Sequence, residues 1–194
     1  MLIDNELGTW ERRVALARVV EAPPAATFGA IRRVDFLESP VVAVPNRARV
    51  LFDRVVRPGV ADATVPARFG FEQLVAEDGG FQLLAEEPGE ELVLGFVGRW
   101  WERGYGRVDW TPEEFRELHR PDCAVGTWGF SVMPYGSGGS VLVTDVRVRC
   151  TDEAARRHFQ RYWALVGPFV TAMGRPVLRL VAREAERVDA PAAA

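Results

Sequence analysis

Two neighbouring segments place the strongest constraint on the fold of this chain: AVGTWGFSVMP at residues 124–134 and SVLVTDVRVRC at residues 140–150. Side chains of a β-strand point to opposite faces in turn, and both segments sort their residues accordingly. The glycines between them suit a tight turn. The pair therefore predicts an antiparallel hairpin with one buried apolar face and one face toward water. The apolar face carries Trp128, Phe130, Val132, Leu142, Thr144, Val146 and Val148.

The polar face of this hairpin carries Asp145 and Arg147, two residues apart. We expect them to be solvated charges, whose pairing contributes under ~1 kcal/mol. Thr144 is the only polar residue among Leu142, Val146 and Val148 on the apolar face of the second strand, and a buried hydroxyl requires a hydrogen-bond partner. A backbone carbonyl is the favoured partner, and a ligand is the alternative.

The spacing of apolar residues changes after Cys150 from two to three, four or seven. This spacing predicts a long amphipathic helix with Thr151 as its N-cap. Pro168 and Pro176 are expected to bend or interrupt the helix, because proline lacks the amide N–H that an inner helical turn needs. The apolar stripe consists of Phe159, Tyr162, Trp163, Val166, Val170, Met173, Val177 and Val181.

Earlier segments supply further strands and a helix. Residues 12–22 are rich in valine and predict a strand. A helix is predicted over residues 23–37, with prolines at its start and Phe28, Ile31 and Val34 at helical spacing. Two apolar runs on either side of EEPGEE, within residues 81–101, predict a second hairpin.

Two shorter helices are also predicted. Residues 112–119 begin with a capping-box pattern, in which Thr111 caps the helix, Pro112 takes its first position and Glu114 follows. The segment NRARVLFDRVV, at residues 46–56, is a further helix candidate between prolines.

The adjacent tryptophans in LGFVGRWWER point to opposite faces if the strand continues through them. Trp100 shares its face with Leu92, Leu94 and Phe96, which is the more apolar face, so we expect Trp100 inside. Trp101 would then lie outside, beside the guanidinium of Arg99. A β-bulge near Gly98 would exchange the two tryptophans.

Composition limits the class of protein. The length of 194 residues and the 48% hydrophobic content suit one soluble domain, which we place at residues 1–188, with a disordered tail at 189–194. A net charge of -3 argues against a nucleic-acid partner. The N-terminus has no apolar run of signal-peptide length and no uninterrupted apolar segment approaches a membrane span, so a cytoplasmic location is expected.

The charged and reactive residues do not assemble into a recognisable site. All 24 basic residues are arginines, which codon bias in a GC-rich genome explains most simply. In the last helix Glu153, Glu184 and Glu186 interleave with the arginines, so a solvated surface is favoured over a lipid-headgroup site. Neither a disulfide framework nor a metal site is indicated by the two cysteines and two histidines. Cys123, Cys150, His119 and His158 are these four residues, and both histidines are expected at the surface.

The order of these elements resembles the SRPBCC or START-like superfamily, the helix-grip fold of lipid-transfer START domains, birch-pollen-allergen-like proteins and polyketide cyclases. It resembles a group of bacterial SRPBCC proteins most closely. The segments that carry the resemblance are EAPPAATFGAI, LLAEEPGEELVLGFVGRWW and TDVRVRCTDEAARRHFQRYW, with the arginine-rich helix after them. The chain departs from the group at residues 144–148, which read TDVRV where the group tends to read TETRV.

The resemblance implies an α+β fold in which a curved antiparallel sheet wraps around a long C-terminal helix. It also implies a habit of binding apolar molecules between sheet and helix, while it supplies no catalytic residue, metal or cofactor. We therefore expect a protein that binds a small hydrophobic molecule, such as a lipid, polyketide or aromatic metabolite. An enzyme of the cyclase, aromatase or hydratase type in the same cavity and an interaction module with a filled core are the alternatives, and the oligomeric state stays open. The expected ligand-binding residues are Phe96, Trp100, Trp128, Phe130, Thr144, Tyr162 and Trp163.

Overall fold

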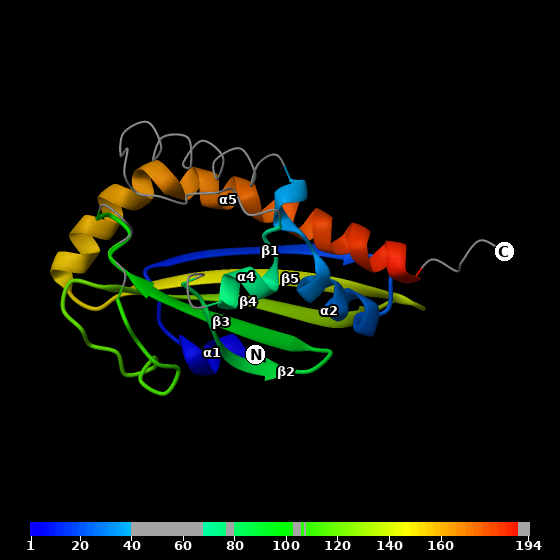
Figure 1. Ribbon diagram of the computed structural model, residues 1–194, viewed down its shortest axis with the longest axis horizontal. Coiled ribbons are helices and arrows are strands. Elements are labelled where there is room, and N and C mark those ends of the chain that lie inside the picture. The colour runs from blue at the N-terminus through cyan, green and yellow to red at the C-terminus, as the bar shows by residue number, and fades with distance from the viewer. Residues whose placement is uncertain (40–67, 77–79, 103–105, 107, 190–194) are drawn as a thin grey trace.

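Figure 1 shows the computed structural model, which describes residues 1–39, 68–76, 80–102, 106 and 108–189. The strands of these residues form one five-stranded antiparallel sheet in the order β1-β5-β4-β3-β2. Both predicted hairpins and the predicted first strand are confirmed. The strands are β1 (Arg12–Val20), β2 (Gln82–Glu87), β3 (Glu91–Gly98), β4 (Ala124–Tyr135) and β5 (Gly139–Cys150).

Helices lie on both sides of this sheet (Figure 1). The long C-terminal helix α5 packs against β1, β4 and β5 and against α2, while α1 contacts β3 and β4. The predicted fold class, an α+β helix-grip arrangement, is thereby confirmed. Predictions for residues 46–56 and 190–194 lie outside the described residues. The helices are α1 (Leu2–Glu6), α2 (Pro24–Arg33), the 3-10 helix η1 (Phe36–Glu38), α4 (Phe71–Val75) and α5 (Glu153–Asp189).

The start of α5 differs from its prediction. Asp152, and not Thr151, caps the helix, because Asp152 Oδ1 accepts a hydrogen bond from the amide of Ala155 at 2.8 Å. The Thr151 hydroxyl instead bonds both the amide and the carbonyl of Cys123, which ties the end of β5 to the start of β4. Aspartate is a better N-cap than threonine, because its carboxylate accepts hydrogen bonds from the unpaired N–H groups of the first helical turn.

The two prolines of α5 do not interrupt it. The helix is continuous from Glu153 to Asp189 with Pro168 and Pro176 inside it, and Figure 1 shows it arching along the sheet. The prediction that the prolines interrupt the helix is therefore wrong. Burial of Val177 and Val181 after the second proline holds the helix against the rest of the protein.

The helix predicted at residues 112–119 is absent, and the chain makes successive turns there. Glu114 does accept a hydrogen bond from the amide of Thr111, as the capping-box pattern predicts. However, Phe115 and Leu118 are buried with Trp110 in a separate apolar cluster. A helix of this length is marginal without packing, so tertiary contacts decide its conformation.

The second face of the sheet is covered rather than open to water, which corrects the prediction. Ile3 of α1 is 2% exposed and lies over Gly129, where a Cβ atom would come within 2.8 Å of the isoleucine Cδ1. The absence of a side chain at Gly129 thus lets α1 approach the strand closely. Phe115 and Trp110 cover the far part of the same face, against Val125.

Asp145 and Arg147 are therefore buried at 2% exposure each, and the prediction of a solvated pair is wrong. Asp145 accepts hydrogen bonds from the guanidinium groups of Arg13 and Arg147. Arg147 also donates to Asp4 and to the carbonyl of Leu7. The Trp10 ring covers this cluster, with its centroid 4.4 Å from the Arg147 guanidinium carbon. The N-terminal residues convert a surface charge pattern into a buried polar network.

Candidate functional site

The sheet face beneath α5 is packed tightly at its two ends and less tightly between them. Leu92, Phe130 and Leu142 are at most 2% exposed at one end, and Ala124 and Cys150 are buried at the other. Between them, Phe96 and Trp128 on two of the inner strands and Val146 on a third are only partly buried. Their neighbours on the same face, Leu94, Thr144 and Val148, are buried. Inner strands beneath a covering helix normally bury all such residues, so solvent reaches part of the middle of this face.

The sheet-facing side of α5 follows the same pattern. Phe159 is 1% exposed near the start of the helix, and Val177 and Val181 are buried in its second half. The apolar residues of the intervening part are only partly buried. They are Tyr162, Trp163, Val166, Val170 and Met173.

Aromatic rings form a connected line through this middle region. Phe96 lies at its centre, with its ring centroid 5.1 Å from that of Trp100 and 5.0 Å from that of Phe81. Gly126 makes room for it, because a Cβ atom there would lie 2.4 Å from the Phe96 Cζ. The Phe81 ring continues to Trp128 at 5.9 Å. Such spacings are those of packed aromatic pairs.

The line extends to α5 and to the opposite end of the face. Trp100 meets Phe159 at 6.0 Å, and Phe159 in turn meets Tyr162 at 6.2 Å and Trp163 at 5.5 Å. At the other end Trp128 meets Phe130 at 5.1 Å. The six aromatic residues expected to bind a ligand are thus connected on one face, with Phe130 at its buried end.

Four aromatic residues outside the predicted site join the line, and one of them, Phe69, does so through Phe36, whose ring centroid lies 6.4 Å from its own. Phe81 and Phe159 are the connecting members, and Phe36 adds a ring 6.0 Å from that of Trp128. Phe159 could have been found, since it leads the apolar stripe of the helix. Phe81 lies one residue before β2, and Phe36 lies in a short 3-10 helix, so neither belongs to a long periodic pattern.

One hydrogen bond gives this apolar surface a polar point. The indole Nε1–H of Trp128 donates to the hydroxyl of Thr144 at 2.8 Å. The prediction that Thr144 bonds to a backbone carbonyl is therefore wrong. A hydroxyl can donate as well as accept, so Thr144 keeps its proton for a further acceptor.

The two adjacent tryptophans both reach α5, although from different sides. Trp100 faces inward as predicted, with no register shift between β3 and β4 at Gly98. Trp101 was expected beside Arg99 but packs on the ring of His158 at 5.7 Å. The reason is that β3 ends at Gly98 and the chain turns, with the amide of Glu102 bonded to the carbonyl of Arg99. Strand alternation no longer applies beyond that turn.

The two histidines have different environments. His119 is exposed, as predicted. His158 is only partly so, because its Nδ1 lies 3.0 Å from Asp122 Oδ1 beside the Trp101 ring. Asp122 adopts a positive φ of 53°, and its amide donates to Asp152. These contacts tie the loop before β4 to the first turns of α5.

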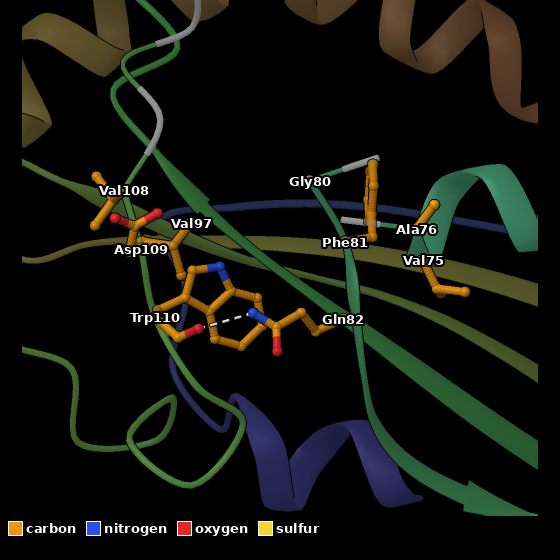
Figure 2. A pocket seen from close by; sticks show the side chains of 9 residues that line it. All are labelled: Val75, Ala76, Gly80, Phe81, Gln82, Val97, Val108, Asp109 and Trp110. Carbon is orange, nitrogen blue, oxygen red and sulfur yellow. Dashed lines mark hydrogen bonds between the residues drawn. The ribbon is translucent and has the colours of Figure 1, made fainter. Parts of the chain in front are cut away.

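A cavity of about 350 Å³ opens at the edge of the sheet, where β2 begins. Figure 2 shows Phe81 on one side of it and Trp110 on the other, with Gln82 between them. The amide of Gln82 donates to the carbonyl of Trp110 at 2.8 Å. None of the seven predicted residues lines this cavity, but its wall residue Phe81 contacts two of them, Phe96 and Trp128.

The described residues offer little for metal or nucleophilic chemistry. They contain no group of three or more His, Cys, Asp or Glu side chains that could hold a metal ion. Both cysteines are buried. Burial raises the pKa of the Cys150 thiol to about 12, so this residue is a neutral thiol at pH 7. The aromatic surface is suited to holding an apolar molecule.

By length and composition alone, α5 could cross a membrane, and within the described ranges it is the one helix with this property. The core helix of a soluble protein meets the same criterion, so this is weak evidence for a span. Here α5 lies along the sheet (Figure 1).

No protein-family model matches the chain, and no curated protein matches it significantly. Among solved structures, the chain is similar to protein MLL2253 from Mesorhizobium loti, with 16% identity over 92% of this chain and 99% of that one and a TM-score of 0.41. The Zhui aromatase/cyclase from Streptomyces sp. R1128 shares 13% identity over 92% and 96%, with a TM-score of 0.32. A START superfamily protein from Mycobacterium smegmatis shares 13% over 91% and 96%, with a TM-score of 0.29.

Likenesses at these scores carry no conclusion about function. The fold is evident from the chain itself, in which a hairpin-built antiparallel sheet carries a C-terminal helix along one face. The element order and this helix-covered sheet identify an α+β helix-grip fold.

Proposed function

We propose that this protein binds a small hydrophobic molecule between the middle of the sheet and α5, among the rings of Phe96, Trp100, Trp128 and Trp163. The observation that carries the proposal is the partial exposure of these rings on a face whose two ends are closed. An apolar molecule in that place removes the remaining aromatic surface from water. Burial of about 300 Å² of apolar surface contributes about 7 kcal/mol before the cost of association.

The chemistry of the surface defines the class of ligand. Aromatic rings favour flat or chain-like apolar molecules that stack or lie across them. The hydroxyl of Thr144, oriented by the Trp128 indole, can donate to one carbonyl or hydroxyl oxygen of the ligand. A fatty acid or an aromatic polyketide-like phenol carries both features. Apolar contact provides most of the affinity, and this polar point provides orientation.

The Trp128→Ala variant tests the location of the site. We expect it to weaken the binding of oleic acid or 1-naphthol at least tenfold, because Trp128 contacts Phe36, Phe81 and Phe130 and orients Thr144. Isothermal titration calorimetry with each probe measures the dissociation constant. Circular dichroism first establishes that the variant is folded.

Trp110→Ala is the matched control, since it removes the same side chain from the opposite face of the sheet and from the edge cavity. We expect it to leave the affinity within about twofold. A loss of binding in Trp110→Ala with full binding in folded Trp128→Ala would place the ligand in the edge cavity and overturn the proposed site.

A further inference from the structure

The face of α5 that points away from the sheet is apolar in its middle. Leu165 is 83% exposed and Phe169 is 38% exposed, and Pro168 and Ala172 between and after them are exposed too. These four residues occupy positions i, i+3, i+4 and i+7, so they share one side of the helix. Large apolar side chains at such exposure on neighbouring turns mark an interaction surface.

Arginines continue this side of the helix in both directions. Arg157 and Arg161 precede the apolar residues, and Arg175, Arg179 and Arg183 follow them, again at intervals of three or four. All five are exposed, and none has an ion-pair partner among the described residues. We call these five arginines and the four apolar residues the outer stripe of α5.

The acidic residues that were expected to dilute these arginines lie outside the stripe. No Asp or Glu occurs in the sequence between residues 154 and 183. Glu153 pairs with Arg156, and Glu184 pairs with Arg33 and Arg187. Glu186 accepts a hydrogen bond from the backbone amide of Glu21. Asp152, just before the helix, interacts electrostatically with Arg157 alone among the five, so the rest of the stripe keeps its positive charge.

We propose that the outer stripe of α5 is a docking surface for an anionic phospholipid membrane, with the helix lying in the plane of the interface. Arginine forks bind phosphate oxygens well, and the apolar middle can enter the boundary between headgroups and acyl chains. The opposite side of α5, including Val177 and Val181, stays buried in the protein. The helix consequently lies on the membrane and does not cross it.

Charge complementarity favours this occupant over a second copy of the chain. If the stripes of two chains packed antiparallel about Pro168, Arg161 of one chain would face Arg175 of the other. Arg157 would likewise face Arg179. A parallel pair places each arginine opposite itself. Like charges in direct opposition weaken association, so an anionic surface is the better partner.

Two other occupants fit less well. Nucleic acid meets proteins through a mostly polar surface, whereas the centre of this stripe is apolar. The segment 40–67 of the same chain carries four arginines against two aspartates, so its charge does not complement the stripe. An anionic bilayer supplies both the negative charge and the apolar phase that the stripe requires.

The test is flotation of the full-length protein with vesicles of phosphatidylcholine alone and of phosphatidylcholine mixed with phosphatidylglycerol. Binding is expected only to the anionic vesicles, and it should weaken with added salt, which screens the arginines. Arg161→Gln should lower the partition coefficient about fivefold. Leu165→Ser should lower it about tenfold, since it removes the most exposed apolar group.

Each variant has a matched control away from the stripe. Arg120→Gln removes an exposed arginine from the loop before β4, and Leu83→Ser removes a leucine of β2 that is 39% exposed. Both should bind anionic vesicles as the unaltered protein does. The proposal is overturned by absence of binding to anionic vesicles, by equal binding to both compositions, or by equal effects of stripe and control variants. Self-association that Leu165→Ser abolishes, without vesicle binding, would assign the stripe to a second copy.

The result of the vesicle flotation experiment does not depend on the proposed ligand site. The residues of the outer stripe lie on the side of α5 away from the aromatic rings, so Leu165→Ser should bind 1-naphthol normally. Failure of vesicle docking with intact 1-naphthol binding rejects this inference alone.

Discussion

Replacing Asp145 by alanine should lower the free energy of unfolding by about 3–5 kcal/mol. Asp145 is 2% exposed and balances the equally buried Arg147, so the substitution leaves a guanidinium charge in the protein without its buried carboxylate partner. Asp4 remains as a partner of Arg147, but its side chain is half exposed. Urea unfolding followed by circular dichroism measures the effect as a shift of the midpoint.

Arg13→Gln is the control for this variant. Arg13 also pairs with Asp145, but its side chain is 42% exposed, and we expect a loss under about 1 kcal/mol. The double variant Asp145→Ala/Arg147→Met should be more stable than Asp145→Ala, because it removes the uncompensated charge. Equal stabilities of Asp145→Ala and Arg13→Gln would contradict a buried network under the N-terminal residues.

Replacing Phe159 by alanine should cost about 3–5 kcal/mol of stability. Its ring is 1% exposed and lies between Trp100 and two rings of α5, Tyr162 and Trp163, so it fastens the first half of the helix to the sheet. Alanine leaves a cavity that these large rings cannot close without moving. Thermal and urea unfolding both measure the loss.

Phe169→Ala is the matched control on the same helix. The Phe169 ring is 38% exposed and belongs to the outer stripe, and a substitution there should change stability by under about 0.5 kcal/mol. A large loss in Phe169→Ala, or a negligible one in Phe159→Ala, would mean that α5 presents a different side to the sheet.

The strands and the long helix were predictable because their signals are local and repeated. Alternation in residues 124–150 predicts the face that Trp128 and Val146 share, and the structure pairs them; the three-and-four spacing after Cys150 predicts α5. The polar side of the hairpin could not be assigned in this way. It is covered by a five-residue helix, α1, which is too short to leave a periodic signal.

The same distinction separates the predicted and the missed site residues. Phe96, Trp100, Trp128 and Phe130 were found by strand alternation, and the structure places them in one line of rings. Phe81 and Phe36 come from segments between regular elements, which only the folded chain brings to this face. The partner of Thr144 was missed for a related reason. Trp128 was already assigned to the apolar face, and its indole N–H was not counted as a donor.

Native mass spectrometry of the freshly purified full-length protein, followed by denaturing extraction, is the most direct test of ligand binding on the aromatic surface. We expect a species heavier than the 21.6 kDa chain by the mass of one small apolar molecule, which denaturation releases. The Trp128→Ala variant should lose that species while Trp110→Ala retains it. Detection of the bare chain alone, with no thermal shift on addition of fatty acids or aromatic phenols, would contradict the account.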